Sequence, residues 1–181
     1  MLTKNAKTLI AALLFRSYAT PGTIKSTSGV VVRLTDLASS GSSCAYSSYA
    51  LLSSALNTLQ NTGGVGVSVA KDGAEPSIDD YVLPNPLSTS EIQSKSSVPV
   101  TINYYSDYAE VSATYPLTNQ TKAPITVTNI GAVIQIRGTA ENSSSTSYYY
   151  MLFDHTKLVT PVIIQAGETK SVTYTIRINL S

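Results

Sequence analysis

The end of the chain constrains the fold most, because residues 172–180 alternate strictly between apolar and polar side chains. The apolar positions are Val172, Tyr174, Ile176, Ile178 and Leu180, and the polar ones are Thr173, Thr175, Arg177 and Asn179. Side chains alternate across a strand, so this pattern predicts a strand with one core face. Residues 159–165 are mostly apolar without alternation, which favours a strand covered on both faces. Gly167 can turn the chain between them. We therefore expect residues 157–180 to form an antiparallel pair that closes a β-sandwich.

Similar patterns run through the rest of the second half. Residues 98–104 and 109–117 each place apolar side chains at alternate positions, and a polar turn at 119–123 separates them from an apolar strand at 125–136. A Ser-rich loop tip at 141–147 precedes a strand at 148–153, and residues 154–156 are predicted to turn into the final pair. Short strands separated by turn signals indicate a mainly β, antiparallel, jelly-roll-like sandwich rather than a parallel α/β sheet. Residues 98–181 are expected to form its core.

The N-terminal residues 2–18 predict a helix with Thr3 as its N-cap, ended by Thr20-Pro21-Gly22. The alternative is a secretory signal, because Lys4 and Lys7 precede a short apolar run. That run is too short to span a bilayer, and Arg16 interrupts it. We favour the helix and treat residues 1–20 as a docking segment.

Residues 21–97 are predicted to contribute strands and a long loop to the same domain as residues 98–181. Strands are expected within 28–36 and 65–70, with a turn at 61–64. The apolar spacing in 47–60 favours a short helix, and a strand of an edge hairpin is the alternative. Residues 71–97 carry several Gly and Pro turn signals, so we expect an irregular connection. Long connections of this kind are often functional or packed against a partner.

Composition limits the classes of function. Charged residues make up 13% of the chain, about half the usual share. The formal net charge of +1 argues against nucleic-acid binding, which needs a basic patch. Weak charge also gives weak repulsion between copies, so we expect neighbours to cover part of the surface. The single cysteine, Cys44, excludes an internal disulfide and a cysteine-based metal site.

Candidate chemical groups have simpler structural interpretations. His155 is the only histidine, and Asp154 beside it would point to the other face of a strand, so no Ser-His-Asp arrangement is predicted. We expect His155 to be a turn residue. Asp79 and Asp80 do not match a Ca²⁺ loop and are expected to stabilise turns. We therefore predict no catalytic residue, metal or cofactor.

Two tyrosine clusters leave two interpretations open. Tyr104, Tyr105 and Tyr108 form one, and residues 148–150 form the other. They could form a carbohydrate- or protein-contact surface, or alternate members could fill the core while the others cover the sheet, because adjacent strand residues face opposite ways.

In residues 65–83 (VGVSVAKDGAEPSIDDYVL), a Gly-rich strand precedes a Pro-containing loop and an Asp-Asp-Tyr-x-Leu element. This order resembles a segment of small tailed-bacteriophage virion structural proteins. Residues 125–130 (ITVTNI) and 158–180 resemble their C-terminal sandwich, through Thr-Pro-Val-x-Ile-x-Ala-Gly-Glu and Tyr-Thr-Ile elements. The Met-Leu-x-x-Asn-Ala-Lys start is also similar. The Ser-rich segment 39–48 departs from the pattern.

The resemblance implies a non-enzymatic tail, collar or head-appendage subunit, located in the virion and present in several copies. Its partners would be other virion proteins and copies of itself, without nucleic acid or membrane, and a host receptor is left open. The candidate interface residues are Leu9, Leu13, Phe15, Asp80, Tyr81, Leu83, Tyr105 and Tyr149. The alternative is a secreted bacterial surface module, adhesin-like, with residues 2–19 as its signal. A hydrolase using Asp79 and Asp80 is the third hypothesis.

Overall fold

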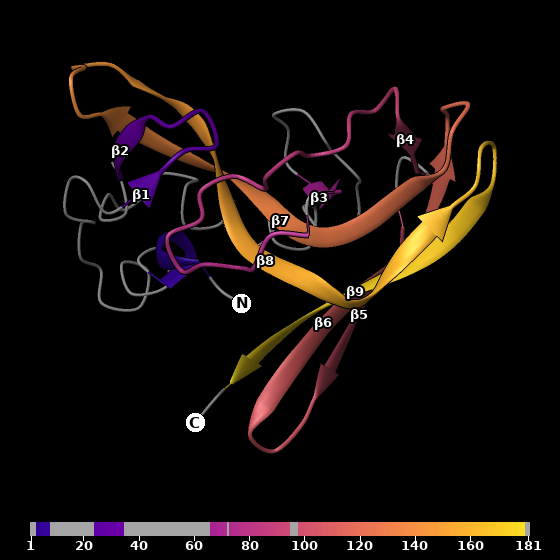
Figure 1. The fold of residues 1–181 in the computed structure, drawn as a ribbon. Coiled ribbons are helices and arrows are strands. Elements are labelled where there is room, and N and C mark those ends of the chain that lie inside the picture. Colours follow the sequence, from indigo (N-terminus) through magenta and orange to yellow (C-terminus); the bar gives the residue numbers. More distant parts are fainter. Residues whose placement is uncertain (1–2, 8–23, 35–65, 72, 95–97, 180–181) are drawn as a thin grey trace.

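The computed structural model describes residues 3–7, 24–34, 66–71, 73–94 and 98–179 (Figure 1). These residues form a mainly β structure of packed antiparallel sheets, as predicted. The strands in chain order are β1 (Ile24–Lys25), β2 (Val31–Leu34), β3 (Gly66–Ala70), β4 (Ile92–Gln93), β5 (Val100–Tyr104), β6 (Tyr108–Asn119), β7 (Ile125–Ala140), β8 (Thr146–Ile164) and β9 (Thr169–Asn179).

Each of the two sheets is built on one long central strand. In the five-stranded sheet, β7 pairs with β8 along one edge and with β2 and β3 in tandem along the other, and β1 lies outside β2. In the four-stranded sheet, β6 pairs with β9 along one edge and with β4 and β5 in tandem along the other. We call these the β7 sheet and the β6 sheet.

The four long strands form one hairpin that is folded over on itself. The pairing runs from Tyr108 opposite Asn179, through the β6–β9 and β7–β8 ladders, to Thr139 opposite Thr146. The chain crosses between the sheets at residues 120–124 and again at 165–168, so the two crossings together make a corner. Figure 1 shows the sheets meeting at that corner and diverging toward the β5–β6 turn and the β7–β8 turn. This winding produces the predicted jelly-roll-like sandwich.

The predicted pairing of residues 157–165 with 172–180 is wrong. β8 pairs with β7 and β9 pairs with β6, so the two segments lie in different sheets. Gly167 does adopt a positive φ of 72°. However, Gly167 N–H donates to Asn119 O over 3.1 Å and Asn119 N–H donates to Glu168 O over 3.0 Å. The turn therefore pairs with the end of β6 and carries the chain from one sheet to the other.

Two further expectations for this region are also wrong. Residues 154–156 are not a turn, because β8 continues through them to Ile164. Residues 159–165 are not covered on both faces, because Val159 is fully exposed and Ile163 is 50% exposed. The ladder shifts register here, since Val162 pairs with Val127 whereas Lys157 pairs with Asn129. The intervening residues of β8 bulge outward, as extra residues in one strand do.

The alternating positions form the core as predicted. The buried side chains of the β6 sheet include Ala109, Val111, Ala113, Tyr115, Leu117, Val172, Tyr174 and Ile176. All five residues of β3 are buried, so this strand is covered on both faces. β5 and the residues just before it behave differently. On the face that Val98 shares with Tyr104, the exposed fraction rises from 5% at Val98 to 78% at Tyr104. β5 therefore extends past the edge of the core.

The N-terminal prediction is confirmed where the structure describes it. Residues 4–7 are helical, and Thr3 Oγ1 accepts a hydrogen bond from Ala6 N–H over 3.2 Å, as an N-cap does. Residues 8–23 lie outside the described residues, as do the predicted helix at 47–60, the turn at 61–64 and the Ser-rich segment. The described residues of the connection, 71 and 73–94, are irregular apart from β4, and Asn85 has a positive φ.

Candidate functional site

The only histidine lies in a buried hydrogen-bonded network rather than in a turn, so that expectation is wrong. His155 is on β8 and is 1% exposed. Its Nδ1 lies 2.6 Å from Asp80 Oδ2, and its Nε2 lies 2.8 Å from Asn129 Nδ2 on β7. A carboxylate can only accept here, and an amide nitrogen can only donate. The partners therefore assign the proton to Nδ1, which donates to Asp80, while Nε2 accepts from Asn129.

This network attaches the long connection to the β7 sheet. Asp80 Oδ2 also accepts from Ser77 N–H over 2.7 Å, which confirms that Asp80 stabilises a turn. Asn129 Nδ2 also donates to Ala74 O over 2.8 Å. The residues between Ala74 and Asp80 are thus held at both ends by side chains from β7 and β8. Asn129 and Asp80 lie 26 and 75 residues from His155 in the sequence, so no local sequence pattern could have revealed this network.

The hydrogen bond between Asp80 and His155 Nδ1 resembles the one that orients the histidine of a catalytic triad. The partner of the other ring nitrogen, Nε2, is different. In a triad, Nε2 faces a nucleophile that gives up its proton. Here Nε2 faces an amide N–H, and the ring is buried. Asn129 Oδ1 is also buried and has no hydrogen-bond partner among the described residues. The arrangement positions the connection, and both ring nitrogens of His155 are engaged by side chains of this chain.

A second polar cluster links the two sheets. Tyr174 on β9 donates its hydroxyl to Asp154 Oδ2 on β8 over 2.6 Å, and Thr156 Oγ1 donates to the same oxygen over 2.9 Å. Asp154 is 4% exposed and Tyr174 is 1% exposed. Burial raises the pKa of Tyr174 well above its usual range, and the Asp154 carboxylate raises this pKa further. The phenol therefore remains a hydrogen-bond donor at any physiological pH.

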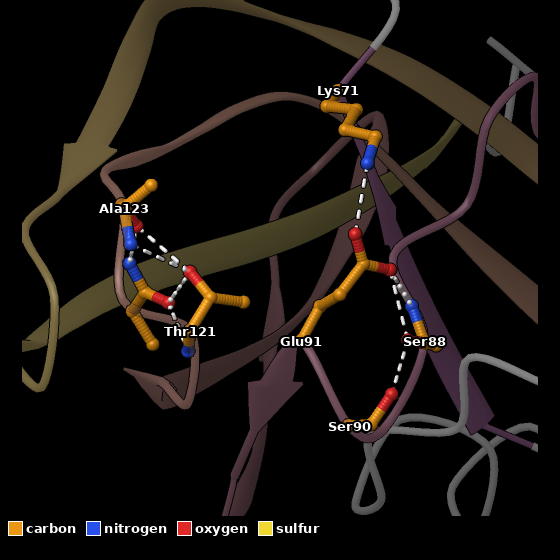
Figure 2. Close-up of polar contacts among 7 residues, drawn as sticks. Lys71, Ser88, Ser90, Glu91, Thr121 and Ala123 are labelled. Carbon is orange, nitrogen blue, oxygen red and sulfur yellow. Dashed lines mark hydrogen bonds and ion pairs between the residues drawn. The ribbon is translucent and has the colours of Figure 1, made fainter.

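Glu91 organises a third polar cluster, at the start of β4 (Figure 2). Its carboxylate accepts from Lys71 Nζ over 2.8 Å, from Ser88 N–H over 2.9 Å and from Ser88 Oγ over 2.8 Å. The Lys71 hydrogen bond and then the Ser88 hydrogen bonds lower the pKa of Glu91 from 4.5 to about 2. Ser88 and Glu91 have the spacing of a capping box, so a local sequence signal for this cluster exists. Figure 2 also shows Thr121 bonded to Ala123 at the corner.

The predicted interface residues have varied surroundings. Leu83 is buried against Ala70, Val133 and Leu152, and Asp80 is bound to His155, so both side chains contact their own chain. The rest of the set is more open: Tyr81 lies under Lys25 Nζ at 4.1 Å, Tyr149 packs half-buried against the core, and Tyr105 is 46% exposed. Leu9, Leu13 and Phe15 lie outside the described residues.

The tyrosines of the two clusters differ in exposure. Tyr104 and Tyr148 are largely exposed, whereas Tyr149 and Tyr150 are half-buried on the β7 sheet. Tyr105 stacks on Tyr108 with the ring centroids 4.4 Å apart. Ile102, which is 48% exposed, and Tyr104 share the other face of the β5–β6 hairpin and form an apolar surface on β5. We call these two residues the β5 surface.

Comparisons with known proteins add no relatives, because no family model, curated protein sequence or solved structure matches this chain. Within the described ranges, no group of three or more His, Cys, Asp or Glu side chains is placed to hold a metal ion. No helix in the described part of the chain has the length and apolar character needed to cross a membrane.

Proposed function

We propose that this chain is a non-enzymatic structural subunit of a tailed-phage virion, in the tail, collar or head appendage. It acts by binding copies of itself and other virion proteins. The observation that carries the proposal is the β5 surface, in which apolar and tyrosine side chains are exposed on a segment without charge. The resemblance of residues 65–83, 125–130 and 158–180 to virion proteins supports the choice of particle.

Covering this surface would stabilise an assembly. Tyr104 is 78% exposed and Ile102 is 48% exposed. A tyrosine side chain buries about 150–250 Å² when it is fully covered. Burial of apolar surface contributes roughly 25 cal/mol per Å², so covering these side chains contributes a few kcal/mol per subunit. Tyrosine is enriched at protein interfaces for this reason. The net charge of +1 leaves little long-range repulsion to oppose contact between copies.

Mass spectrometry of virions tests the proposal. Particles of the phage that encodes the chain would be purified on a density gradient, and this chain would be quantified against the major capsid protein. We expect several copies per particle, retained after a high-salt wash. A phage-encoded replication enzyme, which has no place in a mature particle, is the negative control. Recovery of this chain only in the soluble fraction, together with the replication enzyme, would contradict the proposal.

The rival function is a secreted bacterial surface module, which could use the same tyrosines to bind a glycan or protein. The described N-terminal residues favour the virion proposal, because Thr3 and Ala6 are 0% exposed and Asn5 is 4% exposed. Removing them would expose parts of β1 and β8. N-terminal sequencing of the mature protein separates the two: we expect residues 3–7 to be retained, and cleavage after Ala19 would support the secreted module.

A further inference from the structure

Several sheet edges in the described part of the chain are covered by other segments, whereas the edge of β5 is not. Asn5 covers the edge of β1, because its Oδ1 accepts from Lys25 N–H over 2.9 Å and its Nδ2 donates to Lys25 O over 2.6 Å. The edge of β3 is covered by the connection, where Leu87 N–H donates to Val69 O. On β8, the carbonyls of Tyr150 and Phe153 accept from Thr27 and Thr3 N–H. These contacts protect edges that could otherwise pair with another chain.

β5 has no such cover among the described residues, where β6 is its only strand partner. The hairpin register fixes which of its backbone groups are free. Tyr105 N–H donates to Tyr108 O over 2.9 Å, so that pair is hydrogen-bonded. Hydrogen-bonded and non-hydrogen-bonded pairs alternate along an antiparallel ladder. Thr101 and Asn103 therefore bond to β6, and the N–H and C=O groups of Val100, Ile102 and Tyr104 point outward.

The side chains on this edge are apolar or neutral. Residues 98–106 contain no charged residue. β9, in contrast, carries Lys170 and Arg177, and charged side chains of this kind deter pairing at an edge. The exposed residues Ile102 and Tyr104 share a face with the core residues Val111 and Ala109, which lie opposite them on β6. A strand added to β5 would continue that apolar face.

We propose that β5 pairs with β5 of a second copy of this chain, antiparallel, around a two-fold axis at Ile102. In this register, Ile102 of one copy lies opposite Ile102 of the other. Val100 of each copy lies opposite Tyr104 of the other copy. Every one of these residues directs its N–H and C=O outward, so each pair is a hydrogen-bonded pair. Thr101 lies opposite Asn103 on the other face. The pairing joins the two β6 sheets into one continuous sheet.

Self-pairing suits this edge better than a charged partner strand. Around a two-fold axis, each residue of one copy lies near the same segment of the other copy, so a charged side chain on β5 would face a charge of the same sign. Residues 98–106 avoid this repulsion because they carry no charged side chain. Figure 1 shows the β5–β6 hairpin at the lower end of the molecule, with the β7–β8 turn at the opposite end. This inference rests on the proposed assembly function and names one contact that would carry it.

A disulfide test reports the register directly. In a Cys44→Ser background, Ile102→Cys would place the two thiols opposite each other. The Cα atoms of a hydrogen-bonded pair lie about 5.5 Å apart, which is within reach of a disulfide. Thr101→Cys is the matched control, because Thr101 lies opposite Asn103 and about 8 Å from its own counterpart. We expect covalent dimer from Ile102→Cys and at least about tenfold less from Thr101→Cys. Equal yields from the two variants would overturn the register.

A proline substitution tests whether the backbone makes the contact. Ile102→Pro removes only an outward N–H, so the β5–β6 ladder is kept. Ile102→Val keeps the N–H and is the control. By sedimentation equilibrium, we expect the wild type and Ile102→Val to approach twice the 19.2 kDa of one chain as concentration rises. Loss of the central hydrogen bonds should weaken the Ile102→Pro dimer at least about tenfold. Matching circular dichroism and melting curves would establish that both variants are folded.

The outcomes separate this inference from the proposed function. If the wild type associates and Ile102→Pro associates equally well, the β5 contact is wrong and another surface carries assembly. A wild type that is monomeric at every concentration also overturns the β5 contact. If Ile102→Pro dissociates the dimer but the chain is absent from virions, the contact stands and the virion function is wrong.

Discussion

At the scale of single residues, the two sheets are joined by a buried hydrogen bond as well as by apolar packing. Tyr174 on β9 donates to Asp154 on β8, and both side chains are almost fully buried. A buried carboxylate that loses a donor has no water to replace it. The contact therefore contributes both stability and a fixed alignment of one sheet on the other.

Tyr174→Phe should lower the free energy of unfolding by about 1–3 kcal/mol, because the Asp154 carboxylate loses one of its buried donors. Tyr148→Phe is the control, since Tyr148 is 63% exposed. It should change stability by less than about 0.5 kcal/mol. Urea denaturation followed by circular dichroism measures both. Equal effects of the two substitutions would show that the hydroxyl of Tyr174 does not stabilise the fold.

Glu91→Gln should remove a contribution to stability that depends on pH. The pKa of Glu91 is lowered from 4.5 to about 2 in the folded protein, so the folded state favours the carboxylate. The wild-type advantage is therefore complete above about pH 4.5 and is lost as the pH falls toward 2. Glu91 and Lys71 are partly exposed, so solvent screening limits the advantage to about 1 kcal/mol at neutral pH.

Denaturation curves from pH 7 to pH 2 measure this difference. We expect the wild type and Glu91→Gln to converge at the acid end. Glu141→Gln serves as the control, because Glu141 is exposed in the β7–β8 turn and makes no ion pair among the described residues. A gap between the wild type and Glu91→Gln that stayed constant across this range would argue against the ion pair.

At the scale of elements, β7 and β8 approach so closely at Gly131 that a side chain cannot fit. A Cβ atom added there would lie 2.5 Å from Asp154 O and 3.0 Å from Leu152 Cδ1. The first of these atoms belongs to the backbone, so the strands would have to separate. His155 lies opposite Gly131, and the separation would also strain the His155 network.

Gly131→Ala should therefore destabilise the protein by about 1–3 kcal/mol. Gly167→Ala is the comparison, because nothing lies within 4 Å of its added Cβ and the cost comes only from its φ of 72°. That cost should be about 1 kcal/mol. Thermal or urea denaturation of both variants ranks them. A smaller loss for Gly131→Ala than for Gly167→Ala would mean that the close approach of β7 and β8 is not present.

Alternation of side chains was sufficient to predict most strands of the second half. The pattern around Tyr115 and Tyr174 gave the buried faces of β6 and β9 correctly, because burial on one face acts on every second residue. Strand pairing could not be predicted in the same way. The turn at Gly167 is compatible with a hairpin and with a crossing between sheets, and the choice depends on Asn119, which lies 48 residues earlier.

The candidate site was less predictable than the fold. His155 and Asp80 were both considered from the sequence, but as separate turn residues, since a contact between residues so far apart leaves no local pattern. The bulge in β8 likewise depends on how β7 pairs with it. The Glu91 cluster was predictable in part, because Ser88 and Glu91 have capping-box spacing.

At the scale of the whole molecule, the chain is a long hairpin folded into two layers, with its other segments placed along the edges. Asn5, Thr27 and Leu87 all bond to strand edges that the fold would otherwise leave open. β5 has no such cover among the described residues, and residues 98–106 carry no charge. A subunit built this way has one edge ready to receive a strand, and this is the basis for the assembly function we propose.

Amide hydrogen exchange, resolved by residue, tests this account most directly. The account predicts that the amides of Val100, Ile102 and Tyr104 exchange rapidly in dilute protein and are strongly protected at high concentration. The amides of Thr101 and Asn103, which bond to β6, should be protected equally at both concentrations. If Val100, Ile102 and Tyr104 exchange at the same rate in dilute and concentrated protein, the open edge of β5 does not form the contact between copies.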